Sequence, residues 1–173
     1  MTVIKSKNFI LRPYRRRDAE SLAKNINNKK IFRNTANIPY PYTLRDAKKW
    51  IVRNMKERKK KKPVMINFVI DVNGEVAGSV GFHKIEGHKA EIGYWLAEKY
   101  WGRGIMTEAV KLITRFGFKK LKLKRIYGRV YSFNKASIRV LEKAGYKLEG
   151  ILKKNTRKGK KFIDDYLFAS VGQ

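Results

Sequence analysis

The sequence predicts one mixed α/β domain, in which a central, mostly antiparallel sheet of seven strands is flanked by about four helices. Three observations predict it. Short apolar runs alternate with turn residues, which is the pattern of strands. Four segments carry helix signals, either a capping residue at the start or apolar residues at helical spacing. The chain has 173 residues, of which 43% are apolar, so its length and composition suit a single domain over residues 1–173.

The first half of the chain is expected to hold one strand, two helices and then a meander of strands. Thr43 and Asp46 have the spacing of a capping box, which marks the start of the second helix. Asn73 and Gly74 form a strong hairpin signal between two apolar runs. The expected elements are strand 8–12, helices 18–28 and 43–62, and strands 64–71, 75–83 and 91–97.

The second half changes period. Apolar residues recur at three- and four-residue intervals after Gly104, which predicts an amphipathic helix. Asn134 is a good helix N-cap, and Gly145 stands where a helix commonly ends. The expected elements are helix 104–120, strand 125–131, helix 134–141, and strands 146–152 and 162–170 around a polar loop at 155–160.

The charge balance is strongly basic. Lysine and arginine number 42 against 14 aspartate and glutamate residues, for a net charge of +28. Such a field attracts polyanions, which indicates either association with ribosomes or nucleic acid or a host whose proteins are generally basic. No apolar run reaches the roughly 20 residues of a membrane span, and no signal peptide is evident. We therefore expect a cytoplasmic protein with no membrane association.

Residue types absent from the chain narrow the chemistry. With no cysteine, disulfides, thiolate metal sites and cysteine nucleophiles are excluded. The two histidines, His83 and His88, flank a turn and are interpreted as incidental surface residues. We therefore expect no metal site.

The sharpest local feature is the segment WGRGIMTEA at residues 101–109, between an expected strand and the start of a helix. Two glycines allow the backbone to approach a ligand closely, and free amides at a helix start favour phosphate. A Walker A loop is excluded because no Gly-Lys-Ser/Thr follows, and a dinucleotide fingerprint lacks its third glycine, where Thr107 stands. A plain tight turn is the alternative interpretation.

The surroundings of this turn resemble a known family. The segments EIGYWLAEKYWGRGIMTEAV and VYSFNKASIRVLEKAGYKLEG, within residues 91–150, resemble motifs A and B of the GCN5-related N-acetyltransferases (GNAT). They are most similar to the branch that contains the RimJ/RimL-type ribosomal-protein N-terminal acetyltransferases. The resemblance implies acetyl-CoA as co-substrate. It also implies a sheet that splays between the fourth and fifth strands, 91–97 and 125–131, to admit the pantetheine arm.

The resemblance also implies a set of cofactor-binding residues. Backbone groups of Leu96 and Ala97 would pair with the pantetheine arm, and Asn134 would contact it while also capping a helix. The pyrophosphate would lie in the turn and helix start formed by Gly102, Arg103, Gly104, Ile105, Met106 and Thr107.

Acyl transfer to an amine needs a neutral amine, a stabilised oxyanion and a protonated leaving thiolate. By resemblance, Glu149 matches a carboxylate proposed as base, and Glu91 matches an acidic position used elsewhere in the superfamily. Ser137 matches a serine near the CoA sulfur, whereas the position of the usual acid, a tyrosine, is Leu141 here. Each of the three polar residues could instead be an ordinary surface or helix-start residue.

The function predicted from these features is direct transfer of acetyl from acetyl-CoA to a primary amine, most specifically a protein N-terminus. Two alternatives stay open. The acceptor could be a small amine such as a polyamine, an aminoglycoside or an amino acid, or the protein could bind ribosomes or nucleic acid without turnover. A monomer or a homodimer is expected.

Overall fold

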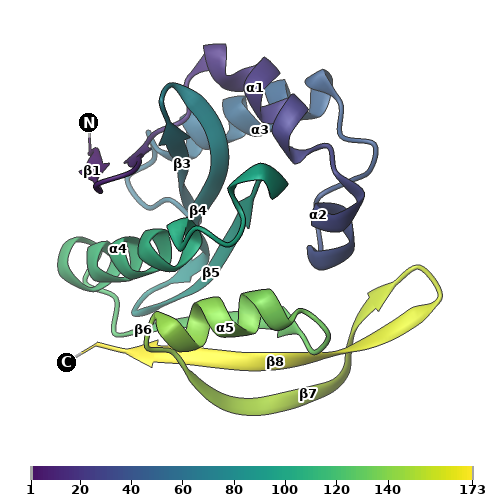
Figure 1. The fold of residues 1–173 in the computed structure, drawn as a ribbon. Helices are drawn as coiled ribbons and strands as arrows, with labels where there is room; N and C mark the ends of the chain where they lie inside the picture. Colours follow the sequence, from purple (N-terminus) through teal and green to yellow (C-terminus); the bar gives the residue numbers. More distant parts are fainter. Residues whose placement is uncertain (1, 173) are drawn as a thin grey trace.

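The computed structural model describes residues 2–172, which form an eight-stranded mixed sheet and five α-helices (Figure 1). The strand order is β1-β2-β3-β4-β5-β6-β8-β7, and every neighbouring pair is antiparallel except the parallel pair β5–β6. The predicted mixed, mostly antiparallel sheet is confirmed. The strands are β1 (Ile4–Lys5), β2 (Ile10–Arg12), β3 (Ile66–Val72), β4 (Glu75–Glu86), β5 (Lys89–Leu96), β6 (Arg125–Tyr131), β7 (Lys147–Lys158) and β8 (Lys161–Val171), and the helices are α1 (Ala19–Ile26), α2 (Lys29–Asn34), α3 (Leu44–Glu57), α4 (Ile105–Lys120) and α5 (Lys135–Lys143).

Two short elements, the strand β1 and the helix α2, were not among the seven strands and four helices expected. β1 has only two residues and pairs with β2 at the sheet edge. α2 has six residues, of which only Ile31 is buried. It is started by Asn28, whose Oδ1 accepts from the amides of Lys30 at 2.7 Å and Ile31 at 3.3 Å. With one buried residue, α2 has no apolar period to reveal it.

The loop expected at residues 155–160 is wrong, because β7 and β8 continue through it to a tight turn at Gly159. The buried carboxylate of Asp165 accepts from Asn155 and Thr156, both at 2.7 Å. Hydrogen bonds to a buried partner thus extend the hairpin through a segment whose polar composition reads as loop.

The tip of this hairpin reaches α2 (Figure 1). Lys158 Nζ donates to the carbonyls of Thr35 at 2.7 Å and Arg33 at 3.3 Å, and also to Phe32 O. A cation at the end of a helix satisfies carbonyls that have no helical partner. The β7–β8 hairpin and α2 therefore enclose one side of the space in front of the splayed strands.

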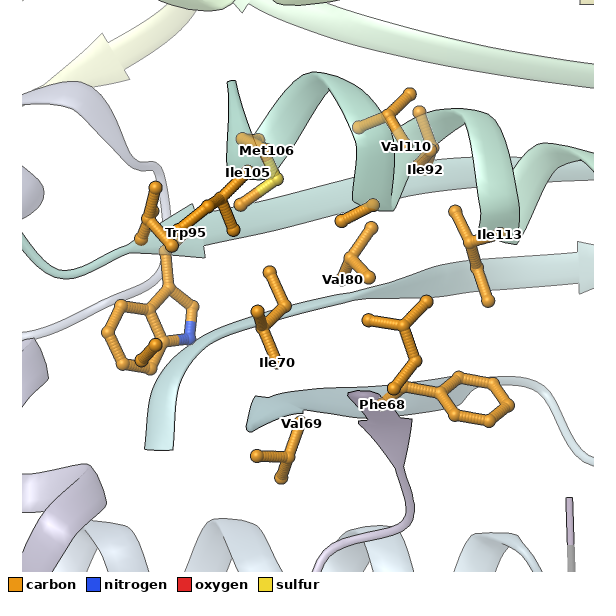
Figure 2. Packing of buried hydrophobic residues seen from close by; sticks show 14 of the residues in the cluster. Phe68, Val69, Ile70, Val80, Ile92, Trp95, Ile105, Met106, Val110 and Ile113 are labelled. Atoms are coloured by element: carbon orange, nitrogen blue, oxygen red, sulfur yellow. The ribbon is translucent and has the colours of Figure 1, made fainter. Parts of the chain in front are cut away.

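Helix α4 supplies much of the apolar core. Figure 2 shows Val80 and Ile92 of the sheet facing Val110 and Ile113 of α4, all four buried. Gly117 allows this close approach, because a Cβ there would lie 2.7 Å from Cζ of Phe82. The packing fixes α4, and with it the glycine turn at its start, against the sheet.

Among residues 2–172, no helix is long and apolar enough to cross a bilayer.

The strands β5 and β6 pair over only three residues and then diverge. The opening between them positions the site. Their parallel pairing runs only from Lys89↔Arg125 to Glu91↔Tyr127. The rest of β5 pairs with β4 alone, and the rest of β6 with β8 alone. The predicted splay between the strands at 91–97 and 125–131 is therefore confirmed.

A buried ionic cluster fixes β2 to the neighbouring strand β3. Arg12, 1% exposed, donates to both carboxylate oxygens of Asp18, at 2.8 and 2.9 Å. Its Nε donates to Asp71 on β3 at 2.5 Å. Every charge in the cluster has an opposite partner, which is the condition under which buried charges are tolerated.

Candidate active site

The turn between β5 and α4 contains two glycines in the left-handed region, Gly102 with φ 74° and Gly104 with φ 73°. No atom lies within 4 Å of a Cβ built on either, so the space above the turn is open. Conformation rather than crowding therefore requires glycine here. The amides of the first turn of α4 have no helical acceptors, as at any helix start, and they favour an anion in front of them.

The expected phosphate-binding residues differ in what they can offer. The side chains of Ile105 and Met106 are buried in the core beside Trp95 (Figure 2), so only their backbone amides are free to meet a phosphate. Thr107 is half-buried. Arg103 is exposed, with its guanidinium carbon 5.7 Å from the ring centre of Tyr100, and it can bring positive charge to the turn.

The turn is tied to β4 and β5 by specific bonds. Trp101 Nε1 donates to Leu96 O at 2.7 Å, and Ala97 N donates to Ala77 O at 2.8 Å. The amide of Ala97 thus already has a partner within the chain, although the resemblance implied that Ala97 would pair with pantetheine. Glu75 accepts from Lys99 at 2.5 Å and from Tyr100; hydrogen bonds from Lys99, Tyr100 and Asn25 lower the pKa of Glu75 to about 2.

Across the open gap, Tyr94 of β5 contacts Ser137 of α5, whose first turn is capped by Asn134. Asn134 caps α5, accepting from the amide of Ser137 at 3.1 Å. Ser137 Oγ lies 2.7 Å from the hydroxyl of Tyr94 on β5. Burial raises the pKa of Tyr94, so its phenol stays protonated at neutral pH. Tyr94 was not foreseen, yet it brings a phenol into the gap where residue 141 supplies only the buried leucine.

A second cluster lies where β4 and β5 still pair. Glu91 stands opposite His83 in the ladder. Burial alone would raise the pKa of Glu91, but hydrogen bonds and charges from Arg129, at 2.8 Å, and Lys84, at 3.0 Å, hold that pKa below its ordinary value. Glu91 is therefore an ionised carboxylate held between two cations.

His83 corrects the prediction that both histidines are incidental surface residues. His88 is exposed, as expected, but the imidazole of His83 is half-buried and leans across Gly93. A Cβ on Gly93 would lie 3.0 Å from Nε2 of His83. Burial lowers the pKa of His83, so a neutral ring with a free lone pair dominates at neutral pH.

These two clusters line one cavity of about 860 Å³ in front of the splayed strands. Of the residues predicted from the sequence, the structure brings Glu91, Asn134 and Ser137 together there. The lining residues that sequence reasoning missed and that can carry chemistry include His83, Tyr94, Arg53, Lys84 and Arg129. Residues 2–172 hold no group of three or more acidic or histidine side chains that could bind a metal ion.

The remaining predicted residue, Glu149, does not line this cavity. It forms a two-bond ion pair with Arg125 at the closed end of the β5–β6 gap, with one bond of 2.8 Å. Hydrogen bonds from Arg125 hold the pKa of Glu149 below its ordinary value. Its role as base stays a prediction, and the placement favours residues on β4 and β5 instead.

The splayed parallel strands, the glycine turn before α4 and the adjoining cavity define an enzyme that holds an extended cofactor beside an acceptor pocket. A family model described as "Acetyltransferase (GNAT) domain" matches residues 8–147. The probable N-acetyltransferase YjcK of Bacillus subtilis is 35% identical over 90% of this chain and 89% of its own. The spermidine N(1)-acetyltransferase of Escherichia coli K12 is 30% identical over 82% of this chain and 74% of its own. The chain therefore belongs to the GNAT family of N-acetyltransferases, and its co-substrate is acetyl-CoA.

The likeness to the RimJ/RimL-type enzymes is confirmed for the fold. The solved structure of RimL, a ribosomal L7/L12 α-N-protein acetyltransferase in complex with coenzyme A, superposes with a TM-score of 0.89. It covers 98% of each chain at 22% identity. At that identity the match speaks for the architecture, and the acceptor has to be argued from the site.

Proposed function

We propose that this enzyme acetylates the α-amine at the N-terminus of a polypeptide by direct transfer from acetyl-CoA. The observation that carries the proposal is the single cavity that brings a neutral imidazole, His83, and a hydroxyl pair, Tyr94 and Ser137, to the open β5–β6 gap. An acceptor amine and a thioester brought into that cavity would react between these groups.

His83 is the proposed general base. An N-terminal amine has a pKa of about 7.7–8.0, so near neutral pH a modest base is enough to take its proton during attack. The imidazole of His83 is neutral there and faces the cavity. Glu91, fixed by Arg129 and Lys84, is too acidic to be a good base, and its charge instead favours the imidazolium that forms at His83.

The hydroxyl pair would serve the leaving group. When the tetrahedral intermediate collapses, the bond between carbon and sulfur breaks, and the CoA thiolate takes up a proton. Tyr94 and Ser137 share one hydrogen bond of 2.7 Å. One of them can therefore donate to the sulfur while the other re-supplies its proton. The chain has no cysteine, so the acetyl group passes to the amine without an acetyl-cysteine intermediate.

The charge of the cavity favours a polypeptide N-terminus over a polyamine. The cations of the cavity lining, Arg53, Lys84 and Arg129, outnumber its two carboxylates, Glu86 and Glu91. This net positive charge disfavours a polycation such as spermidine. The relationship to a spermidine acetyltransferase supports the competing acceptor, so the two have to be compared directly.

The test is acetyl transfer by the purified protein, followed as thiol release and by mass spectrometry of the product. The acceptors are a peptide with a free N-terminus, the same peptide N-terminally blocked but containing lysine, and spermidine. We expect a single acetyl group on the free α-amine and no reaction of the blocked peptide. Turnover of spermidine with both peptides inert would contradict the proposal.

A further inference from the structure

A second, shallow groove of about 540 Å³ runs along α3, outside the cavity described above. Its lining residues recur at helical spacing and so lie along one face of the helix. Arg53 lines both the groove and the cavity. The two hollows therefore adjoin at the side chain of Arg53. Its lining residues are Lys48, Lys49, Val52, Arg53, Lys56, Glu57 and Lys60.

The groove is a strongly basic surface. Five of its side chains are cationic and one is anionic. That one, Glu57, already forms an ion pair with Lys60 and accepts from the amide of Val64 at 3.2 Å. Arg53 has no hydrogen-bond or ion-pair partner within residues 2–172. Most of the positive charge of this face is thus left for an external partner.

The same excess continues at the cavity mouth. Lys84 and Arg129 share the single carboxylate of Glu91, so this trio keeps one net positive charge. Glu86 is paired with Lys89 at 3.5 Å. A chain that passes from the cavity onto α3 therefore meets a net positive charge in both hollows.

We propose that the acceptor is an acidic polypeptide, whose first residue enters the cavity while carboxylates in the next few residues bind Arg53 and the lysines of the α3 groove. The proposal rests on the proposed function and names its substrate class. From Lys48 to Lys56 the helix rises roughly 12 Å. An extended peptide covers that distance in about four residues. Acidic residues close behind the N-terminus, rather than charge anywhere in the partner, should therefore determine selection.

A polypeptide fits this surface better than RNA because of where the groove leads. It adjoins the cavity that holds His83, the proposed base. A nucleic acid could occupy the basic groove but would leave the cavity unused. The adjacency of the two hollows at Arg53 thus favours a partner that carries both carboxylates and a terminal amine.

The test compares three peptides that share length and first residue, with acidic, neutral or basic residues at the following positions. The rate constant kcat/KM is measured by thiol release at low and high ionic strength. We expect the acidic peptide to be preferred by about tenfold at low ionic strength, with the preference shrinking as salt screens the charges.

A groove variant, Lys49→Glu with Lys56→Glu, is compared with a matched control, Lys119→Glu with Lys120→Glu. The control lysines end α4 and line neither hollow. The groove variant should lose the preference for the acidic peptide and keep the parent KM for acetyl-CoA, whereas the control should keep the preference.

Equal rates for the three peptides, or equal effects of the two variants, would overturn this inference while leaving N-terminal acetylation in place. Failure to acetylate any peptide, with acetyl-CoA still bound, would overturn the proposed function as well. Tight binding of an RNA oligonucleotide that depends on the groove, without a peptide preference, would assign the groove to nucleic acid and overturn the proposal too.

Discussion

His83 stands directly opposite Glu91 across the β4–β5 ladder, yet only Glu91 is held by cations that keep it ionised. The imidazole instead rests over Gly93 and stays neutral because it is partly buried. In the mechanism that we propose, His83 accepts the proton and Glu91 supplies a fixed charge beside it.

The first prediction concerns His83→Gln. The base works when it is neutral, and burial lowers its pKa below the ordinary 6.5. In the parent, kcat should therefore rise with pH through that lowered pKa and then level off. In the variant, kcat should no longer show this rise with pH, the acid limb of the pH–rate profile. The variant should turn over about 100-fold more slowly, with the KM for acetyl-CoA unchanged.

The same pH–rate measurement on Glu149→Gln separates the two candidate bases. Glu149 is paired with Arg125 outside the cavity, so its loss should leave the limb in place. If Glu149→Gln loses the limb and His83→Gln keeps it, the base is Glu149 and the assignment to His83 is wrong.

The second prediction concerns Tyr94→Phe and Ser137→Ala. Each change breaks the hydrogen bond that links the two hydroxyls, so each should lower kcat by about tenfold or more. Because the pair acts as one unit, the double variant should be little slower than the worse single one. Strictly additive losses, measured under saturating acetyl-CoA, would show that the two hydroxyls act separately.

The third prediction concerns Gly104→Asp. Any side chain is strained at φ 73°, and a carboxylate at the start of α4 would repel the pyrophosphate. Calorimetry should detect no binding of CoA. The matched control is Gly159→Asp, a left-handed glycine in the β7–β8 turn, which should fold with similar strain and still bind CoA. Unchanged CoA affinity in Gly104→Asp would contradict the phosphate site.

The fourth prediction concerns stability. Arg12→Met removes the cation between Asp18 and Asp71 and leaves two buried carboxylates without their partner. The free energy of unfolding should fall by about 3–5 kcal/mol. Lys5→Met, a change of the same type at an exposed edge position, should change it by less than about 0.5 kcal/mol in denaturant titrations. Similar losses in both would show that the buried cluster adds little.

The fold was largely predictable because its long elements repeat a period. The buried strands of the meander and the amphipathic helices α3 and α4 are each predicted by the spacing of apolar residues within the element. The exceptions depend on distant partners. The carbonyl of Thr35 at the end of α2 accepts from Lys158 of the far hairpin, and Asn155 of β7 donates to the buried Asp165. No local pattern contains either contact.

The residues of the candidate site likewise fall into those that the sequence predicted and those that only the structure shows. Asn134 and Ser137 were found because they lie within a motif, and Glu91 because it opens a strand of that motif. His83 and Tyr94 were missed because a residue near a turn or within an alternating strand gives no sign of facing a cavity. Arg53 lies on the polar side of α3, where a cation is ordinarily interpreted as a solvated surface residue. Only the structure shows that it lines both the groove and the cavity.

The central claim is that one cavity holds the N-terminal amine against the thioester. A bisubstrate compound, in which the α-nitrogen of an acidic peptide is joined through an acetyl bridge to the sulfur of CoA, tests it most directly by inhibition kinetics. We predict that this compound binds more tightly than either half and competes with both acetyl-CoA and the peptide. Competition with acetyl-CoA alone, at the affinity of CoA itself, would place the acceptor elsewhere and contradict the account.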